Sequence, residues 1–355
     1  MKTFCVAPFV NVAITPTGVS KPCCLYRGLN QVKNPIDAFN SDEWNELRNR
    51  MLRNEFINEC DSCNHTDTTG FFQENYSSYR EWFNDRYEYD GTSQIKSIEL
   101  SRSNKCNFKC IICGWDRSSR WYEDEQALSK IVPRLDVPIA SGARIMPGVV
   151  TEKIISSPID QIDFTKVDNL ILQGGEPLLD DKCYEIFDLM PDQSHVFIST
   201  NCSISPSKIP FHKFESVDVN ISIDGINEIG RDVRLGFNTK HFMKILKEWM
   251  SYDNCIIHGH YVYHNMNAFS LQETKDFFMI RDDFHWIDDV LKYPRYLSPR
   301  ILPDYIDLPI EIRKRKYDED ECKNFIKFID YMKTKQNFDK KTLRIYDILN
   351  ENITV

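Results

Sequence analysis

The chain has 355 residues, of which 41% are hydrophobic and 27% are charged, and its formal net charge is −9. This length suffices for about two domains with a substantial core. The acidic balance argues against a surface that neutralises phosphates generally, so we expect no nucleic-acid partner. Pro8 and Asn11 interrupt the apolar start, which lacks the pattern of a signal peptide, and no stretch approaches the ~20 apolar residues of a membrane span. We therefore expect a cytoplasmic protein without a membrane partner.

Cysteines are unevenly distributed along the chain. Five of the twelve stand near the amino terminus, at positions 5, 23, 24, 60 and 63, and three more stand at 106, 110 and 113. In a reducing compartment, clustered thiols bind metal or take part in redox chemistry. The other four are scattered, and we expect ordinary buried side chains at Cys183, Cys202, Cys255 and Cys322.

The order of predicted elements divides the chain into four regions. Residues 1–75 are rich in loops and contain one predicted helix, over 41–54, which Ser41 can cap and whose apolar stripe is Trp44, Leu47, Met51 and Leu52. Residues 76–94 have the composition of a connector. Residues 95–292 alternate between short strand-like and helical segments, which is typical of βαβ units and a parallel sheet. Residues 293–355 form an extension with a predicted helix around 319–335.

Six strands and four helices are predicted between 95 and 292. The strands cover 95–101, 167–173, 195–200, 216–223, 255–264 and 284–293. The helices cover 115–132, 180–190, 239–250 and 271–280, and residues 133–165 form an inserted loop.

Several of these strands alternate between apolar and polar residues, although strands covered on both sides are usually apolar throughout. Asn220 alternates with Val219 and Ile221, His258 and His260 share one face together with His264, and Glu99 lies opposite Ile98 and Leu100. The pattern predicts a curved sheet with helices on the convex side and a polar ligand cavity on the concave side. Candidate substrate contacts are Glu99, Asn220, His258 and His260, and the two histidines could alternatively chelate a metal.

Cys106, Cys110 and Cys113 follow the first of these strands with the spacing Cys-x3-Cys-x2-Cys. A structural zinc site requires four ligands, and disulfide pairing would leave one thiol over. Three thiolates on one loop suit a [4Fe–4S] cluster with one open iron. This motif, at the end of the first strand of an α/β region, resembles that of the radical S-adenosylmethionine (radical SAM) superfamily. Members usually have an aromatic residue before the third cysteine, where this chain has Ile112.

The resemblance implies a partial (β/α)6 barrel in which the cluster on Cys106, Cys110 and Cys113 binds S-adenosylmethionine. Such enzymes cleave this cosubstrate to a 5′-deoxyadenosyl radical, which takes a hydrogen atom from the substrate. "LQGGEPLL" matches the family's Gly-Gly-Glu-Pro motif, in which the glycines would let the backbone approach a ligand and Glu176 would meet an ammonium group. The family positions for the cosubstrate fall on Gly174, Gly175, Glu176, Pro177, Ser199, Asn201, Ser222, Asp224 and Arg234.

The amino-terminal cysteines have the pattern Cys5-x12-Gly18-x4-Cys23, followed by Cys60-x2-Cys63. This resembles an auxiliary-cluster motif of the twitch and SPASM extensions, which normally follow the barrel and here would precede it. The resemblance implies a second [4Fe–4S] cluster on Cys5, Cys23, Cys60 and Cys63, with Cys24 as the alternative to Cys23. A zinc ribbon built from the same four thiolates remains open.

The predicted function is hydrogen abstraction from a polar substrate, either a peptide or protein residue or a small metabolite, with net oxidation. Redox-neutral epimerisation or rearrangement is the alternative reaction. A non-catalytic iron–sulfur or redox-sensing protein is an alternative class, and a non-radical methyltransferase would have no use for the three-cysteine motif. The resemblance also implies an electron donor such as flavodoxin or ferredoxin.

Overall fold

The structure is a computed structural model that describes residues 3–28, 34–61, 63, 79–132, 152–278, 285–291, 294–309 and 316–353. Most of the predicted inserted loop, residues 133–151, lies outside the described residues. Within the described part of the chain, no helix is both long enough and apolar enough to cross a membrane.

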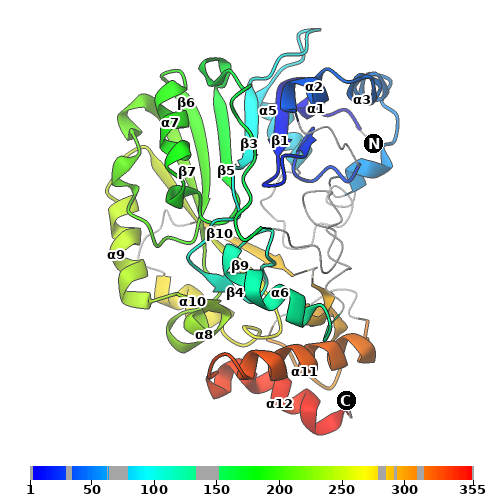
Figure 1. Ribbon diagram of the computed structural model, residues 1–355, viewed down its shortest axis with the longest axis vertical. Helices are drawn as coiled ribbons and strands as arrows, with labels where there is room; N and C mark the ends of the chain where they lie inside the picture. The colour runs from blue at the N-terminus through cyan, green and yellow to red at the C-terminus, as the bar shows by residue number, and fades with distance from the viewer. Residues whose placement is uncertain are drawn as a thin grey trace.

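A largely parallel sheet of eight strands forms the centre of the fold (Figure 1). Its strand order is β10-β9-β7-β6-β5-β3-β1-β2. All six predicted strands are confirmed: β3 (Ser97–Ser101), β5 (Asn169–Gln173), β6 (Ser194–Thr200), β7 (Phe214–Ser222), β9 (Cys255–Tyr263) and β10 (His285–Val290). Each of them is parallel to the next in chain order. Their carboxyl ends therefore gather at one edge of the sheet, where α/β folds build their sites.

The amino-terminal region adds two strands that the sequence did not predict. β1 (Asn11–Ile14) lies parallel to β3, with Val12 opposite Ile98, and β2 (Ser20–Lys21) pairs antiparallel with β1. All four residues of β1 are buried, so it packs on both faces. The amino-terminal cysteines are therefore attached to the edge of the same sheet that carries the other motifs.

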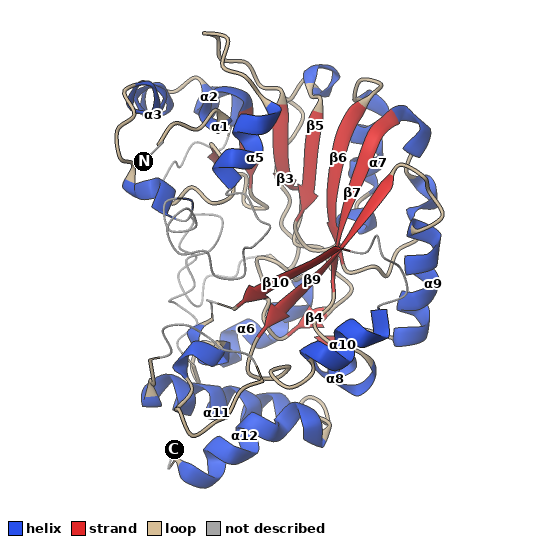
Figure 2. Ribbon diagram, turned by 180° about the vertical axis from the view of Figure 1, so that it is seen from behind, coloured by secondary structure: helices blue, strands red, loops and turns tan. Residues whose placement is uncertain are grey.

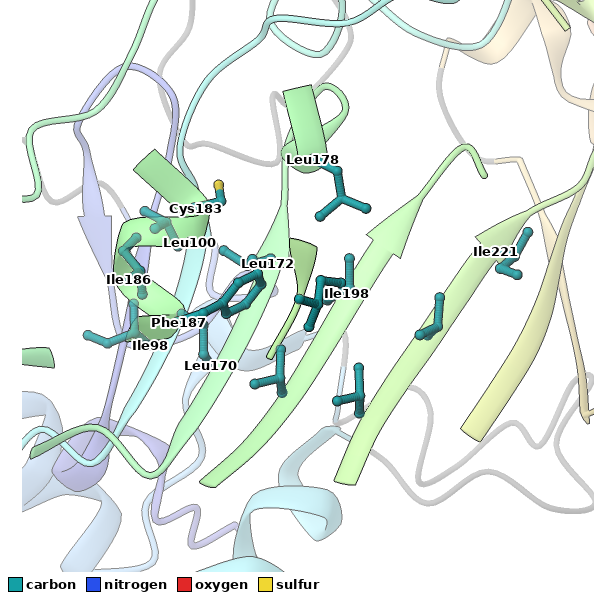
Figure 3. Close-up of a cluster of buried hydrophobic side chains, with 14 of the residues drawn as sticks. Ile98, Leu100, Leu170, Leu172, Leu178, Cys183, Ile186, Phe187, Ile198 and Ile221 are labelled. Carbon is teal, nitrogen blue, oxygen red and sulfur yellow. The ribbon is translucent and has the colours of Figure 1, made fainter. Parts of the chain in front are cut away.

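Helices cover one face of the sheet. α7 (Asp181–Leu189), α9 (Thr239–Trp249) and α10 (Leu271–Phe278) are confirmed near their predicted positions. Figure 3 shows Leu170 and Ile198 of the strands pointing toward Ile186 and Phe187 of α7, and these side chains are at most 1% exposed. α6 (Tyr122–Leu128) is shorter than predicted at both ends, since a 3-10 turn, Ser119–Trp121, precedes it and Ser129 caps its carboxyl end. Figure 2 shows β9 and β10 turned sharply away from the direction of β3 to β7.

The amino-terminal helices are α1 (Ala7–Val10), α2 (Pro35–Phe39), α3 (Asp42–Leu52) and α5 (Tyr79–Arg86). The predicted cap of α3 is confirmed, since the Trp44 amide donates to Ser41 Oγ at 3.3 Å. Leu52 was predicted in the buried stripe but is 45% exposed, because one residue beyond Met51 the helix has turned by about 100° away from the buried face. Arg48 is buried instead, and its Nε donates to the Pro8 carbonyl at 2.8 Å.

The carboxyl-terminal region forms a second core at the other end of the molecule (Figure 2). α11 (Glu319–Lys333) confirms the predicted helix, whereas α12 (Lys340–Asn352) was not predicted. Both helices are amphipathic, and α12 packs against α8 (Asn227–Val233). This core also includes Trp121, which is fully buried close to the three-cysteine loop.

Candidate cluster and cofactor site

The loop with the three cysteines begins just beyond the carboxyl end of β3. Cys110 lies in a two-residue strand, β4 (Lys109–Cys110), which pairs antiparallel with β8 (Arg234–Leu235) and places Cys110 opposite Arg234. The Ile111 amide donates to the Val233 carbonyl at 2.9 Å, and the Cys113 amide donates to the Cys110 carbonyl at 3.0 Å. The loop is therefore a tight turn fixed to the segment that carries Arg234.

Two N–H groups approach the Cys106 sulfur. The Phe108 amide lies 3.4 Å from Sγ and Asn201 Nδ2 lies 3.9 Å from it. Asn201 is 5% exposed, and its Nδ2 also donates to Asn107 Oδ1 at 2.9 Å. Because N–H donors stabilise sulfur that carries negative charge, this arrangement suits a metal-bound thiolate. The predicted residue Asn201 thus contacts the predicted ligand Cys106.

The surroundings of Cys106 and Cys110 favour the protonated form of these two thiols in the metal-free chain. Burial is the main reason that the pKa of Cys106 is raised to about 12, and the neighbouring Cys110 thiol adds to the shift. The pKa of Cys110 lies well above the ordinary thiol value because of its hydrogen bond with Cys113 and its burial. Arg234 opposes both shifts. A metal must displace these protons. Three thiolates would carry more negative charge than a [4Fe–4S] core carries positive charge, and the neighbouring Arg234 guanidinium would offset the excess.

The Gly-Gly-Glu-Pro segment packs against the chain that leads into Cys106. The Gly175 amide donates to the Ser103 carbonyl at 3.0 Å, and the Glu176 amide donates to the Lys105 carbonyl at 2.9 Å. A Cβ on Gly174, whose φ is +126°, would lie 2.7 Å from the Ser103 oxygen, and one on Gly175 would lie 2.3 Å from the Lys105 oxygen. The glycines therefore permit a close approach to the protein's own backbone, whereas the sequence suggested an approach to a ligand.

The Glu176 carboxylate joins the ends of β5 and β6. It is 1% exposed and accepts hydrogen bonds from the Asn201 amide at 2.7 Å, from Thr200 Oγ1 at 3.0 Å and from the Leu178 amide at 3.3 Å. Burial raises the pKa of Glu176 to about 7, although these donors lower it. Pro177, the last residue of the motif, starts a buried 3-10 turn, Pro177–Leu179.

Asp224 and Arg234 form a buried ion pair beside the cysteine loop. Arg234 Nη1 donates to Asp224 Oδ2 at 2.7 Å, and the Val262 amide donates to Asp224 Oδ1 at 3.1 Å. Arg234 is 6% exposed, and its Nε has no hydrogen-bond partner among the described atoms. A buried guanidinium with one free donor is suited to an additional anionic group. Ser199 and Ser222 lie half-buried near the ends of β6 and β7.

The predicted substrate residues of β7 and β9 lie together on the face opposite the helices. The sheet register sets Asn220 opposite His258 and Ser222 opposite His260. Asn220 Nδ2 lies 3.4 Å from His260 Nδ1, and His258 Nε2 lies 3.2 Å from Asp218 Oδ1. His264 was predicted on the same face, but it follows the end of the strand and is fully buried.

Glu99 points to the same face but lies near the other end of the sheet, with β5 and β6 between β3 and β7. It is 3% exposed, and its carboxylate accepts hydrogen bonds from Asn11 Nδ2 at 2.8 Å and from the Cys24 amide at 3.1 Å. The fold therefore brings Asn220, His258 and His260 together and places Glu99 against the amino-terminal segment.

A cavity in the amino-terminal region is lined by Cys5, Cys23, Cys60 and Cys63, the four predicted auxiliary ligands. Arg80 and Phe83 of α5 also line it, and Cys24 does not. Burial raises the pKa of Cys5 and of Cys60 to about 12, and neighbouring thiols add to both shifts. Among the described residues, no three Cys, His, Asp or Glu side chains are arranged to hold a single metal ion.

Two residues of the cysteine-loop surroundings were missed by the sequence reasoning. Trp121 Nε1 donates to the Cys110 carbonyl at 2.9 Å, and Asp124 of α6 forms a buried ion pair with Lys109. The only available signal was a lysine placed between two cysteines and followed by an acidic helix. That pattern does not identify which of the acidic residues is the partner.

The chain matches no protein-family model and no curated protein. Among solved structures it is similar to native anSMEcpe with bound AdoMet and the Cp18Cys peptide, with a TM-score of 0.33 and 15% identity over 73% of this chain and 62% of that chain. It is also similar to hexahistidine-tagged anSMEcpe with bound AdoMet, with a TM-score of 0.36 and 16% identity over 73% of this chain and 60% of that chain. The chain thus spans about three fifths of these structures, and likenesses this weak carry no argument about its function.

Proposed function

We propose that the chain is a radical SAM enzyme with a partial (β/α)6 barrel. The observation that carries this proposal is the hydrogen-bonded convergence of separate motifs around Cys106. Asn201 contacts the Cys106 sulfur, the Gly175 and Glu176 amides bind the residues just before Cys106, and Arg234 faces Cys110. These motifs come from four different parts of the sequence, and a chance cysteine triplet would not require them to meet.

Cys106, Cys110 and Cys113 would hold a [4Fe–4S] cluster with one open iron. When bound together, the cluster and S-adenosylmethionine supply a 5′-deoxyadenosyl radical that removes a hydrogen atom from the substrate. The residues proposed to bind the cosubstrate are Gly174, Gly175, Glu176, Pro177, Ser199, Asn201, Ser222, Asp224 and Arg234. The free Nε of Arg234 offers a donor to the methionine carboxylate, and Asp224 fixes the guanidinium in place.

The amino-terminal cysteines would hold a second [4Fe–4S] cluster. The common cavity of Cys5, Cys23, Cys60 and Cys63 supports this assignment, and it favours Cys23 over Cys24 as the ligand. The same four thiols could hold a zinc ion, and measuring the iron and zinc content of the protein distinguishes the two possibilities. Two cubanes require about eight irons per chain, whereas a zinc ribbon would give about four irons and one zinc.

The substrate is proposed to be polar, either a peptide or protein residue or a small metabolite. Asn220, His258 and His260 offer both donors and acceptors on rigid strands, which can hold one C–H bond in place by hydrogen bonding. Glu99 is left out of this set because it lies near the other end of the sheet, against the amino-terminal segment. Net oxidation is the proposed outcome: the substrate would lose one hydrogen atom to the 5′-deoxyadenosyl radical and one electron to the auxiliary cluster. A flavodoxin or ferredoxin is the proposed electron donor for the cluster that binds S-adenosylmethionine.

The test of cosubstrate binding uses electron paramagnetic resonance of the reconstituted, dithionite-reduced protein. If S-adenosylmethionine binds the open iron, adding it changes the spectrum of the reduced cluster, and Cys106→Ala loses that response. An identical spectrum with and without the cosubstrate would favour an iron–sulfur protein of structural or redox-sensing role.

A further inference from the structure

The two-stranded ladder of β4 and β8, which carries Cys110 and Arg234, is too short to be stable without contacts from other elements. β4 and β8 form only two residue pairs, and isolated two-stranded pairs are marginally stable in water. The neighbours of this ladder therefore decide how firmly the Cys110 thiol faces the Arg234 guanidinium. Contacts from the carboxyl-terminal helices α11 and α12 reach both of its strands.

The first connection runs from α11 through α6 to β4. The Tyr331 hydroxyl donates to Asp124 Oδ1 at 2.5 Å, and Asp124 Oδ2 pairs with Lys109, the residue before Cys110. The side chains of Lys109 and Asp124 are each only 9% exposed, so the pair is shielded from water and salt. Lys335, just beyond the end of α11, places its Nζ 3.5 Å from Asp124 Oδ1.

The second connection is through an aromatic side chain. The Trp121 indole donates to the Cys110 carbonyl at 2.9 Å, and its ring centroid lies 6.4 Å from that of Phe328 on α11. Trp121 and Phe328 are both fully buried. A shift of α11 would therefore move the side chain that holds the Cys110 backbone.

The third connection reaches the opposite strand. Asp232 lies two residues before Arg234 and is 1% exposed. Its Oδ2 accepts hydrogen bonds from the Asp339 amide at 2.6 Å and from Thr342 Oγ1 at 2.9 Å, both of which lie at the start of α12. Gln336, in the turn between the two helices, donates to the Asp232 carbonyl at 3.0 Å.

We infer that the α11–α12 pair is a positioning element for the loop of Cys106, Cys110 and Cys113, here called the cluster loop. It supports β4 through Tyr331 and Phe328 and supports β8 through Asp339 and Thr342, and so it fixes Cys110 opposite Arg234. The identity of the group that this loop binds rests on the proposed function. The support that α11 and α12 give to β4 and β8 does not depend on it. Tyr331, Phe328 and Thr342 are thus positioning residues that act on the metal and cosubstrate site from outside it.

Tyr331→Phe and Tyr87→Phe form a matched pair of variants. Each removes one hydroxyl that donates to a carboxylate, from Tyr331 to Asp124 in one case and from Tyr87 to Asp168 at 2.6 Å in the other. Only the first carboxylate contacts the cluster loop. Thr342→Val is a second test variant, because it removes a donor to Asp232 on the β8 side.

The first readout uses the metal-free protein under reducing conditions and measures alkylation of Cys110 by iodoacetamide, followed by peptide mass spectrometry. Cys110 is 4% exposed, so its reaction requires the ladder to open. Tyr331→Phe and Thr342→Val should speed alkylation about 2- to 30-fold, and Tyr87→Phe should leave the rate unchanged. Equal rates in Tyr331→Phe and Tyr87→Phe, together with an unchanged rate in Thr342→Val, would overturn the inference.

The second readout uses the iron-reconstituted protein and measures the concentration of S-adenosylmethionine that half-saturates the spectral change of the reduced cluster. Tyr331→Phe should raise this concentration, again about 2- to 30-fold, while Tyr87→Phe should match the wild type. An unchanged value in Tyr331→Phe would overturn the positioning role. If Tyr331→Phe speeds alkylation of Cys110 but the wild-type protein assembles no cluster on reconstitution, the positioning role is supported and the proposed function is refuted.

Discussion

Replacing Glu176 with glutamine tests the buried carboxylate that joins the Gly-Gly-Glu-Pro loop to β6. The carboxylate is 1% exposed, and burial raises its pKa from the usual 4.5 to about 7. Folding therefore favours the protonated form of this group. Glutamine resembles that neutral form in shape but cannot ionise, and so it removes the pH dependence that Glu176 contributes.

The sign of the effect follows from proton linkage. Because the folded-state pKa is the higher one, the stability that Glu176 contributes is fully present below pH 4.5 and is lost as the pH rises through 7. The two pKa values correspond to about 3.4 kcal/mol in total, of which about 1.3 kcal/mol is lost between pH 6 and pH 8. The wild type should therefore lose about 1.3 kcal/mol more than Glu176→Gln across this interval.

Urea unfolding of the metal-free proteins, under reducing conditions at pH 6, 7 and 8, gives both free energies of unfolding. All other titrating groups are shared, so the difference between the two proteins isolates position 176. A wild-type advantage that grows with pH would refute the reasoning, since it would mean that the Asn201 and Leu178 amides stabilise the ionised carboxylate more than burial opposes it.

Three further predictions concern the metal and cosubstrate sites. Cys23→Ser should remove the amino-terminal metal and Cys24→Ser should retain it, because only Cys23 lines the cavity; equal metal loss in both variants would contradict this. Gly175→Ala should lower the free energy of unfolding by about 1–3 kcal/mol and impair iron binding at Cys106, because its Cβ would lie 2.3 Å from the Lys105 oxygen. The Cβ of Gly91→Ala would meet no atom within 4 Å; the φ of +88° strains alanine at that position, but iron binding should stay intact. Arg234→Lys keeps the charge but loses the planar fork, so cosubstrate affinity should fall about 10-fold or more, and unchanged affinity in a titration would exclude a role for the guanidinium.

The strands and most of the helices could be predicted because their signals are local. Alternation of Val217, Val219 and Ile221 with polar residues defines β7 without reference to any other segment. The residues that converge on Cys106 were instead identified through their resemblance to radical SAM motifs. The fold brings Glu176 and Asn201 together there because successive parallel strands end at one edge of the sheet.

The features that were missed depend on pairing between distant segments. β1 is only four residues long, and nothing in its sequence indicates that it pairs with β3, which lies more than 80 residues away. For the same reason, Glu99 was predicted as a substrate contact before its partners Asn11 and Cys24 could be known. The glycines of the loop were identified correctly as sites of close approach, but only the fold shows that the approaching group is the backbone of Ser103 to Lys105.

The most direct test of the proposed function is formation of 5′-deoxyadenosine by the iron-reconstituted protein, measured anaerobically with dithionite and S-adenosylmethionine. The wild type should form it, and a variant with alanine at Cys106, Cys110 and Cys113 should form none while keeping the iron bound at Cys5, Cys23, Cys60 and Cys63. Undiminished 5′-deoxyadenosine from that variant, or none from a wild type loaded with iron at both sites, would contradict the proposal.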